Sequence, residues 1–303
     1  MIKSPRPSRF AAVLAATCLI GLTACSSVSS SSDVFSVNGS GYSQDTFASL
    51  VKALSDAGQF KPVDGVLNKE DASVVLRTLI RYEAFSQFIK ENNVKVKQSD
   101  IDTVMKSAEA DTGFAAYPKL LKDLLVNFNV ADVTLKSMAI PKESVLESLY
   151  SKSPASAGVL CLSHILVKTE AEAKTVLADL ASGTKFADEA AKKSIEPGAD
   201  KSGGSLANGE EPCQALANLQ SSFDKDFMIG AVAAKPGVPT GPVKSSFGYH
   251  IILSHPFSEV KQSVTTVVTE NPGTTLLAGF MAVADITINS KYGVWNGATA
   301  TIS

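Results

Sequence analysis

Two apolar runs that each hold one histidine stand out in the pattern of hydrophobic and polar positions. The first begins at Cys161 and ends at Val167, and the second begins at Gly241 and ends at Leu253. Both are rich in β-branched and aromatic residues, a composition typical of strands. A helix-like segment, a Gly/Ser/Asp-rich loop and a second apolar-periodic segment separate them. We therefore expect two central strands of one sheet, with the imidazoles of His164 and His250 meeting.

The residues before this region place apolar side chains at helical spacing after one short strand. Ser43 precedes the first helix, and Ser99 with Asp102 resembles a capping arrangement for a later one. The expected elements are a strand ending in an Asn-Gly turn over Val34–Gly39, a helix through Phe47 and Leu54, a helix from about Lys69 to Asn92, a helix through Ile101 and Met105, a helix through Leu120 and Phe128, and helical segments on both sides of Pro141. Lys152–Ala157, with Pro154 and small polar residues, is the expected domain boundary.

The C-terminal stretch is apolar but short. It holds a β-rich run at Val264–Val268, an apolar segment at Leu276–Val283 and an alternating, strand-like run at Ile286–Asn289. So few residues cannot bury this much apolar surface alone, so we expect them to pack on another part of the chain. The same reasoning predicts a core position for Trp295, the only tryptophan.

Length and charge narrow the class of protein. The 303 residues leave room for about two domains. The chain has 28 basic and 30 acidic residues, a balance that gives no case for a nucleic acid as partner.

The first 24 residues are typical of a secretory signal. Lys3, Arg6 and Arg9 precede a short apolar stretch, and removal of this segment would change the formal net charge from −2 to −5. Leu22–Cys25 resembles a bacterial lipobox, in which Cys25 becomes the acylated N-terminus. Residues 25–33, rich in serine, would then be a flexible tether to the membrane. The alternative is an ordinary secretory signal cut near the same place.

The expected processing determines which cysteines remain in the mature chain. Cys18 leaves with the signal and Cys25 takes the lipid, so Cys161 and Cys213 remain as a pair in an oxidising compartment. A disulfide between them is the default hypothesis, and two free thiols are the alternative. Because Cys161 and His164 are three residues apart, they face opposite sides of a regular strand.

Motifs spread over about residues 158–256 resemble the parvulin family of peptidyl-prolyl isomerases. They are Ser163-His164-Ile165-Leu166-Val167, the helix opening at Lys168–Ala173, Gly183, Phe186–Ala191, Ser194–Gly198, Gly203-Gly204-Ser205-Leu206, Lys235-Pro236-Gly237 and Gly241–Val243 with Phe247-Gly248-Tyr249-His250. The order of a strand, an Asn-Gly turn, helices and then this domain is similar to SurA-like and PrsA-like extracytoplasmic chaperones.

The resemblance implies an α+β fold in which a parvulin-like domain, a small antiparallel-rich sheet flanked by helices, is inserted into a mainly helical chaperone-like module. The implied ranges are 34–153 for the helical part, 158–257 for the isomerase domain and 258–303 for a C-terminal segment that returns to the N-terminal part.

The resemblance also assigns the site. His164 and His250 match the family's paired histidines, Glu196 stands where aspartate or cysteine is usual, and Ser245 matches a hydroxyl position near the histidines. An apolar pocket for the proline ring would use Leu206, Phe223, Phe227 and Phe247. For these apolar residues, core packing is the alternative. Rotation about an X–Pro bond breaks no covalent bond, so we expect no metal and no other cofactor.

Two departures from the family pattern bear on activity. The usual Gly-Gly-Asp-Leu-Gly loop has Ser205 and Ala207 in place of the aspartate and last glycine, and an insert over residues 207–222 follows it. The insert could form a lid, a disulfide-pinned loop or an obstruction over the pocket.

The resulting hypothesis is a lipid-anchored isomerase on the outer face of the cytoplasmic membrane, acting on newly exported polypeptides that contain proline. A holdase chaperone with an inert parvulin domain is the main alternative, and a lipoprotein serving one dedicated partner is a weaker one.

Overall fold

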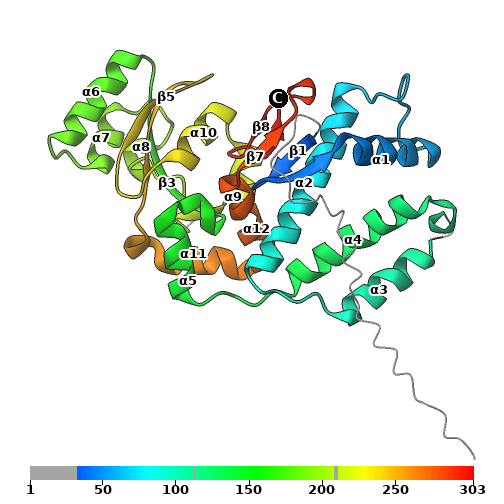
Figure 1. The fold of residues 1–303 in the computed structure, drawn as a ribbon. Coiled ribbons are helices and arrows are strands. Elements are labelled where there is room, and N and C mark those ends of the chain that lie inside the picture. The colour runs from blue at the N-terminus through cyan, green and yellow to red at the C-terminus, as the bar shows by residue number, and fades with distance from the viewer. Residues whose placement is uncertain (1–32, 112, 208–210) are drawn as a thin grey trace, which may run out of the picture.

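The computed structural model describes residues 33–111, 113–207 and 211–303. The expected signal segment, Cys25 and the tether up to residue 32 lie outside these ranges. Two lobes make up the described chain: a parvulin-like lobe around α6 and β5, and a helical lobe around α1 to α4 (Figure 1). Within the described ranges, no helix is long and apolar enough to cross a membrane.

The helical lobe contains a small sheet built from both ends of the described chain. Strands β1 (Asp33–Val37) and β2 (Ser40–Ser43) form a hairpin, and β7 (Ile286–Ile288) pairs with the other edge of β1 in the order β2-β1-β7. Asn38 and Gly39 both adopt positive φ, 47° and 81°, which is why an Asn-Gly pair suits this turn. The strand and turn expected at Val34–Gly39 are confirmed.

Helices complete this lobe. They are α1 (Gln44–Asp56), α2 (Lys69–Glu91), α3 (Gln98–Glu109), α4 (Lys119–Lys136) and α5 (Glu143–Lys152), with the short 3₁₀ turn η1 (Phe114–Ala116) before α4. The Ser43 hydroxyl caps α1 by accepting from the Thr46 N–H at 3.2 Å. The cap expected at Ser99 is wrong, because α3 begins at Gln98 and has Lys97 at its N-cap position without a side-chain hydrogen bond.

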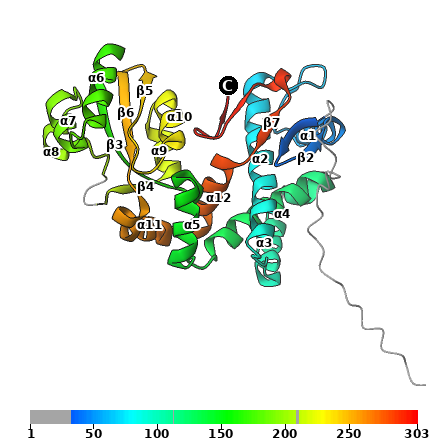
Figure 2. The ribbon, with the colours of Figure 1, turned by 60° about the vertical axis from the view of Figure 1, so that its left-hand side comes forward.

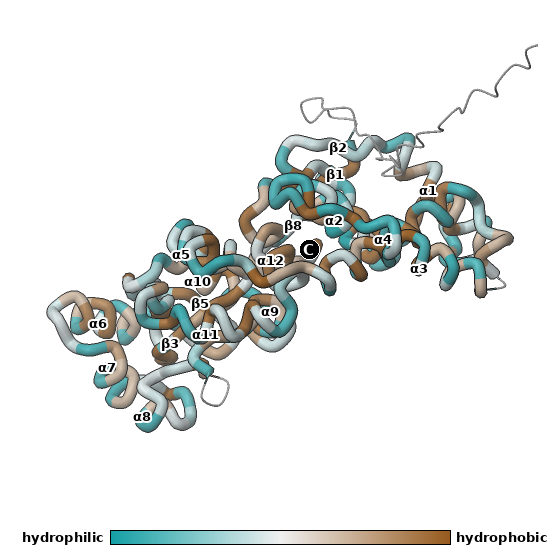
Figure 3. The backbone as a smooth tube through the Cα atoms, turned by 90° about the horizontal axis from the view of Figure 1, so that it is seen from below, coloured by the Kyte–Doolittle hydropathy of each residue, from teal (hydrophilic) through white to brown (hydrophobic). Residues whose placement is uncertain are grey.

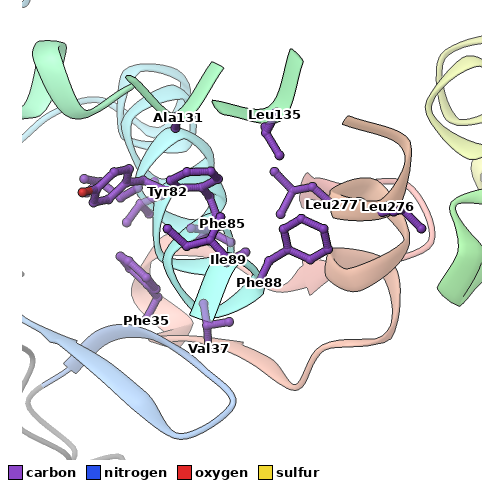
Figure 4. Packing of buried hydrophobic residues seen from close by; sticks show 14 of the residues in the cluster. Phe35, Val37, Tyr82, Phe85, Phe88, Ile89, Ala131, Leu135, Leu276 and Leu277 are labelled. Carbon is purple, nitrogen blue, oxygen red and sulfur yellow. The ribbon is translucent and has the colours of Figure 1, made fainter. Parts of the chain in front are cut away.

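Helix α2 is the centre of the helical lobe. Its aromatic residues Tyr82, Phe85 and Phe88 point towards three neighbouring elements (Figure 4). The partners are Phe35 and Val37 of β1, Ala131 and Leu135 of α4, and Leu277 of α12 (Pro272–Val283). Packing of this kind explains the broad apolar side in the sequence of α2.

The C-terminal segment is helical before it becomes a strand. It forms α11 (Phe257–Glu270) and α12 (Pro272–Val283), so the β-rich interpretation of Val264–Val268 is wrong. Val264, Val267 and Val268 are buried together, at the i, i+3, i+4 spacing of a helix face. Burial of that face outweighs the strand propensity of valine. The strand expected at Ile286–Asn289 is present as β7, and a small hairpin of β8 (Trp295–Asn296) and β9 (Thr301–Ile302) follows the 3₁₀ turn η3 (Ser290–Tyr292).

The segment between the lobes is buried. Pro154–Ala157 forms the 3₁₀ turn η2, which packs against α12, and hydrophobic positions concentrate where α12 lies between the lobes (Figure 3). A Cβ added to Gly279 of α12 would lie 2.4 Å from the Gly158 nitrogen and 2.4 Å from the Ser156 carbonyl oxygen. Only a glycine permits so close an approach, so α12 fixes this connection in place.

The parvulin-like lobe is a four-stranded antiparallel sheet between two layers of helices (Figure 2). Its strands are β3 (Val159–Val167), β4 (Cys213–Ala215), β5 (Thr240–Ser245) and β6 (Gly248–Ser254), in the order β4-β3-β6-β5. Helices α6 (Glu170–Ala181), α7 (Phe186–Lys193) and α8 (Ala199–Ser202) lie on one side, and α9 (Leu216–Ser222) and α10 (Lys225–Ala233) on the other.

Strand β3 is buried along its whole length and its two faces have different partners. Leu160 and Leu162 pack on α9 and α10, whereas Ile165 and Val167 pack on α6 and α7. The expected position of β3 and β6 as central strands is confirmed, as is the α+β fold class with the isomerase-like domain inserted in a helical module.

Candidate active site

The register of β3 and β6 brings the two histidines together. Leu166 lies opposite His250 and His164 lies opposite Ile252, so the histidines are diagonal neighbours on one face. Their Nδ1 atoms are 3.2 Å apart, and their rings stack with centroids at 5.4 Å and planes 15° apart. Both side chains are buried, each with 4% of its surface exposed.

The Ser245 hydroxyl lies at the other end of this pair. Its oxygen accepts the Phe247 backbone N–H at 3.1 Å and lies 2.7 Å from His250 Nε2. When Ser245 donates its proton to Nε2, His250 carries hydrogen on Nδ1 and donates to His164 Nδ1. His164 then carries its hydrogen on Nε2. In a relay of this polarity, no group among the described residues accepts the hydrogen on His164 Nε2.

Burial keeps both imidazoles neutral. It lowers the pKa of His164 from 6.5 to about 4, with the neighbouring His250 adding to the effect. The pKa of His250 is also lowered by burial, although the Asp224 carboxylate opposes that shift. At neutral pH the pair is therefore suited to hydrogen bonding and not to delivering a proton.

Glu196 stands near the free end of the relay. Its Oε2 lies 3.8 Å from His164 Nε2, beyond hydrogen-bonding distance, and 43% of its side chain is exposed. Among the residues that the structure describes, His164 Nε2 has no hydrogen-bond partner. The relay therefore ends at a buried nitrogen that faces a carboxylate across a distance too long for a hydrogen bond.

Aromatic rings form the wall beside the histidines. Phe227 meets both imidazoles edge-on, with ring centroids 5.7 Å from His164 and 5.0 Å from His250. Phe223 stacks on Phe227 at 5.2 Å, and Phe223 and Leu206 are only half-buried. Phe227, which is 2% exposed, is therefore the floor of this wall, while Phe223 and Leu206 offer surface to a ligand.

Phe247 stands apart from the other expected pocket residues. It lies in the turn between β5 and β6, and 69% of its surface is exposed. The structure thus places it at the rim, joined to the site through its backbone hydrogen bond to Ser245.

Asp224 supports the site and was missed by the sequence analysis. Its Oδ1 accepts from the backbone N–H groups of Asp226 and Phe227 and so caps α10, while its Oδ2 accepts from Ser246 at 2.9 Å. Burial raises the pKa of Asp224, but these hydrogen bonds outweigh it and leave the pKa below its usual value. An aspartate three residues before an aromatic residue in an apolar run is a capping signal that could have identified it.

Part of the 207–222 insert belongs to the sheet. Residues 213–222 form the edge strand β4 and helix α9, and Leu216 and Leu219 of α9 are buried. Cys213 faces Cys161 across the β3–β4 pair, with Cα atoms 4.0 Å apart, and the two are joined in a disulfide. Of the three alternatives for the insert, this arrangement matches the disulfide-pinned one. Cys161 packs in the core shared with the helical lobe, so the disulfide lies on the face away from His164.

The third histidine, His255, follows the end of β6. His255 Nε2 is 2.9 Å from the Ser163 hydroxyl, and His255 Nδ1 is 3.4 Å from Glu259 Oε2. The order of the groups is that of a hydrolase triad, but a nucleophile must be reachable and Ser163 is only 5% exposed. The three side chains instead join β3 to the start of α11. No group of three or more potential metal ligands occurs within the described ranges.

A family model described as Rotamase: PPIC-type PPIASE domain matches residues 164–255, a range that begins at the first histidine and contains the second. The chain thus carries a parvulin-type domain. The match covers the relay, the aromatic wall and the insert. It leaves the helical lobe outside.

Foldase proteins named PrsA are among the relatives of the chain. The protein from Clostridium kluyveri is 42% identical over 106 residues, which are 35% of this chain and 28% of the relative. The one from Clostridium botulinum (strain Okra / Type B1) is 31% identical over 171 residues, 54% of this chain and 48% of the relative. The chain spans about half the length, or less, of these curated relatives.

Solved structures give weaker matches. PrsA from Bacillus subtilis is 21% identical and is aligned over 80% of this chain and 88% of its own, with a TM-score of 0.30. NmPin, the parvulin of Nitrosopumilus maritimus, is 33% identical over 32% of this chain and 96% of its own, with a TM-score of 0.28. TM-scores this low do not establish a common overall arrangement.

Proposed function

We propose that this chain is a peptidyl-prolyl cis-trans isomerase that assists the folding of exported polypeptides. The observation that carries the proposal is the chain of contacts from Ser245 through His250 to His164, which ends at the buried, unpartnered Nε2 atom of His164 beside the aromatic wall. It lies within a domain that matches the rotamase model, and the names of the curated relatives describe foldases.

Catalysis of rotation about an X–Pro bond requires preferential binding of the twisted amide. The barrier to rotation is about 20 kcal/mol, because the planar amide is stabilised by resonance. A catalyst lowers it by binding the twisted form more tightly than either planar form. Leu206, Phe223 and Phe227 would hold the proline ring away from water, where an amide with less charge separation is favoured. The His164 N–H would donate to the twisted amide.

Glu196 would act through electrostatics. Its negative charge, 3.8 Å from His164 Nε2, would favour the tautomer with hydrogen on Nε2, and it would disfavour the partial negative charge on the carbonyl oxygen of a planar amide nearby. The longer glutamate side chain reaches this place from the segment that follows α7. Neither role requires the carboxylate to accept a proton.

In this proposal, the cellular location of the protein is inferred from its sequence. The lipobox-like Leu22–Cys25 and the serine-rich segment after it support a lipid anchor on the outer face of the bacterial cytoplasmic membrane. The clients would be newly exported chains that contain proline. The disulfide between Cys161 and Cys213 supports an oxidising compartment.

A proline-isomerisation assay on the soluble form that begins after Cys25 tests the function. Wild type should accelerate the cis–trans exchange of a short X–Pro peptide, and His164→Ala and Glu196→Ala should each reduce kcat/KM. Ser221→Ala, on the exposed side of α9, is the matched control. Equal turnover in all four proteins would overturn the site assignment. Absence of turnover in wild type together with suppressed aggregation of an unfolded client would instead favour a holdase with an inert domain.

A further inference from the structure

A large cavity lies in the helical lobe, on elements that do not contribute to the candidate active site. It has a volume of about 790 Å³, within the range of about 300–1,000 Å³ typical of ligand sites. Its walls come from the end of α2, residues 92–97, the α4–α5 connection, α5, η2 and α12.

The inner surface of this cavity is apolar. Phe88 and Leu276 are buried side chains of its lining, and Phe280 and Met138 add half-buried surface. Methionine can adjust its shape to differing partners, which suits a site for varied sequences. Figure 4 shows Phe88 directed from α2 towards α12, between the two helices that flank this space.

The apolar surface continues to the rim of the cavity. Val145 of α5 and Val283 of α12 line it with 44% and 46% of their surface exposed, respectively. Neighbouring Ile140 is 49% exposed. Large exposed apolar side chains grouped at an opening are typical of a binding surface.

Charged residues of the cavity are mostly basic. Lys95, Lys97 and Lys152 line it, against one acid, Glu91. Within the described part of the chain, none of these three lysines is in an ion pair at 4.0 Å or less. A carboxylate arriving at the opening would therefore meet three lysines, against one acid, that are held in no ion pair.

One polar group of the cavity wall lacks a partner. Ser156 of η2 lines the cavity, is 7% exposed, and its hydroxyl has no hydrogen-bond partner among the described residues. An unpartnered buried hydroxyl costs free energy that a bound amide can recover. A polypeptide backbone offers both the donor and the acceptor that this hydroxyl can use.

We propose that this cavity binds an extended apolar segment of an unfolded client that carries acidic residues at one end. The apolar side chains would occupy the space beside Phe88 and Phe280, and the acidic end would lie against Lys95, Lys97 and Lys152. This inference rests on the chaperone part of the proposed function and is independent of its isomerase part, since the two sites share no residue.

Two fluorescent peptides without proline test the proposal. They have the same apolar core, flanked by two aspartates in one peptide and by two lysines in the other. With the soluble form that begins after Cys25, fluorescence anisotropy should give a Kd at least about tenfold lower for the acidic peptide at low salt. The difference should shrink as salt is added, because exposed charges are screened. Equal affinity for the two peptides, or no binding of either, overturns the proposal.

Two double variants test whether the peptides bind in this cavity. Val145→Asp with Val283→Asp places carboxylates at two half-exposed positions of the opening and should weaken binding of the acidic peptide at least tenfold. Lys97→Glu with Lys152→Glu should reverse the preference between the peptides, and it keeps the test decisive if the valine variant is unstable. Lys61→Glu with Lys201→Glu, an equal change of charge on exposed residues elsewhere, is the control. Unchanged affinity in both cavity variants places the binding elsewhere and overturns the proposal.

Isomerase turnover of the wild-type protein is recorded separately with a short X–Pro peptide. If the wild-type protein isomerises the X–Pro peptide but binds the acidic and basic peptides equally, only the cavity proposal is contradicted. If the acidic peptide is preferred and the variants change this preference as expected, but the X–Pro peptide is not isomerised, only the isomerase function is contradicted.

Discussion

The hydroxyl of Ser245 is the residue-scale feature on which the direction of the imidazole relay depends. We expect Ser245→Ala to reduce kcat/KM for proline isomerisation about fivefold, since one hydrogen bond contributes about 1 kcal/mol. Without the hydroxyl, His250 is free to adopt the other tautomer and His164 Nε2 loses its hydrogen for part of the time. A coupled isomerisation assay without denaturant measures the change, and urea unfolding should show a loss of about 1–3 kcal/mol in stability, because buried His250 Nε2 loses its partner. Full activity in the variant would mean that another group sets the tautomer.

The buried histidine pair also predicts a pH dependence of stability. The pKa of His164 in the folded chain is about 4, below its ordinary value of 6.5, so the unfolded state binds more protons between these values. The free energy of unfolding should therefore fall as the pH decreases from about 6.5 towards 4, by up to about 3 kcal/mol from this group.

His164→Gln removes this titration. Urea midpoints measured at pH 7 and pH 4.5 should show a smaller loss of stability in His164→Gln than in wild type. All other titrating groups are common to both proteins, so the difference between the two losses reports the pair. Identical losses would contradict a neutral, buried His164.

Individual site residues differ in how far the sequence alone could place them. The two histidines lie in apolar strand patterns, so their juxtaposition could be expected from the pairing of two central strands. The sequence around Asp224 contains its helix-capping role but not its contact with Ser246, which approaches from a different element. Phe247 was expected in the pocket from the resemblance to the parvulin family, yet the turn directs it to the rim.

At the scale of elements, the contact between α12 and η2 predicts an unusual effect of a glycine substitution. Gly279→Ala should gain about 1 kcal/mol from helix propensity. The new Cβ, however, would meet backbone atoms of Ser156 and Gly158 at 2.4 Å, and backbone cannot move aside as a flexible side chain can. We expect net destabilisation of about 1–3 kcal/mol, as for an overpacked core. Urea unfolding measures it, with Ala278→Ser on the half-exposed side of α12 as control. A stabilised variant would show that the lobes do not approach this closely.

The disulfide between β3 and β4 predicts a second effect at this scale. It joins residues 52 apart in sequence, and closing a loop of that length in the unfolded chain corresponds to about 4 kcal/mol. Cys161→Ala with Cys213→Ala should lower the free energy of unfolding by up to this amount. The variant should keep most of its isomerase activity, because the bridge lies on the face away from His164. Equal stability of the variant and wild type would indicate that the bridge does not form in solution.

The C-terminal helices show that a local sequence pattern can be insufficient to predict the type of secondary structure. Val264–Val268 has the composition of a strand, and only the burial of Val264, Val267 and Val268 together identifies a helix face. That burial depends on partners far away in the sequence. By contrast, Ser43 and Asn68 lie immediately before their helices, and both cap them through a local hydrogen bond.

At the scale of the whole molecule, the core of the helical lobe extends into the parvulin-like lobe. Val159, Cys161 and Cys213 belong to the same buried cluster as Phe85 and Leu135. The segment that the sequence indicates as a domain boundary is therefore part of the packing. Composition marked it as a linker because proline and small polar residues are common in linkers, but these residues also suit a tight, buried 3₁₀ turn.

The return of the chain to its beginning predicts the effect of a truncation. Removing residues 285–303 deletes β7, which pairs with β1 through Ile288 and Phe35, and leaves one edge of β1 without hydrogen-bond partners. It also uncovers apolar surface around α2 and α12. The sheet that carries the histidines lies entirely in residues 159–254, so its geometry should persist.

We therefore expect the truncated protein to lose stability in its helical lobe first. Far-UV circular dichroism, which is dominated by helices, should report a first urea transition at a lower concentration than in full-length protein. Isomerase activity, followed in the same titration, should persist beyond it. In the full-length chain the shared core couples the lobes, so the two probes should coincide. Loss of activity together with the helical signal in the truncated protein would mean that the parvulin-like sheet depends on the complete helical lobe, because the cluster around Val159 and the disulfide cannot be maintained without it.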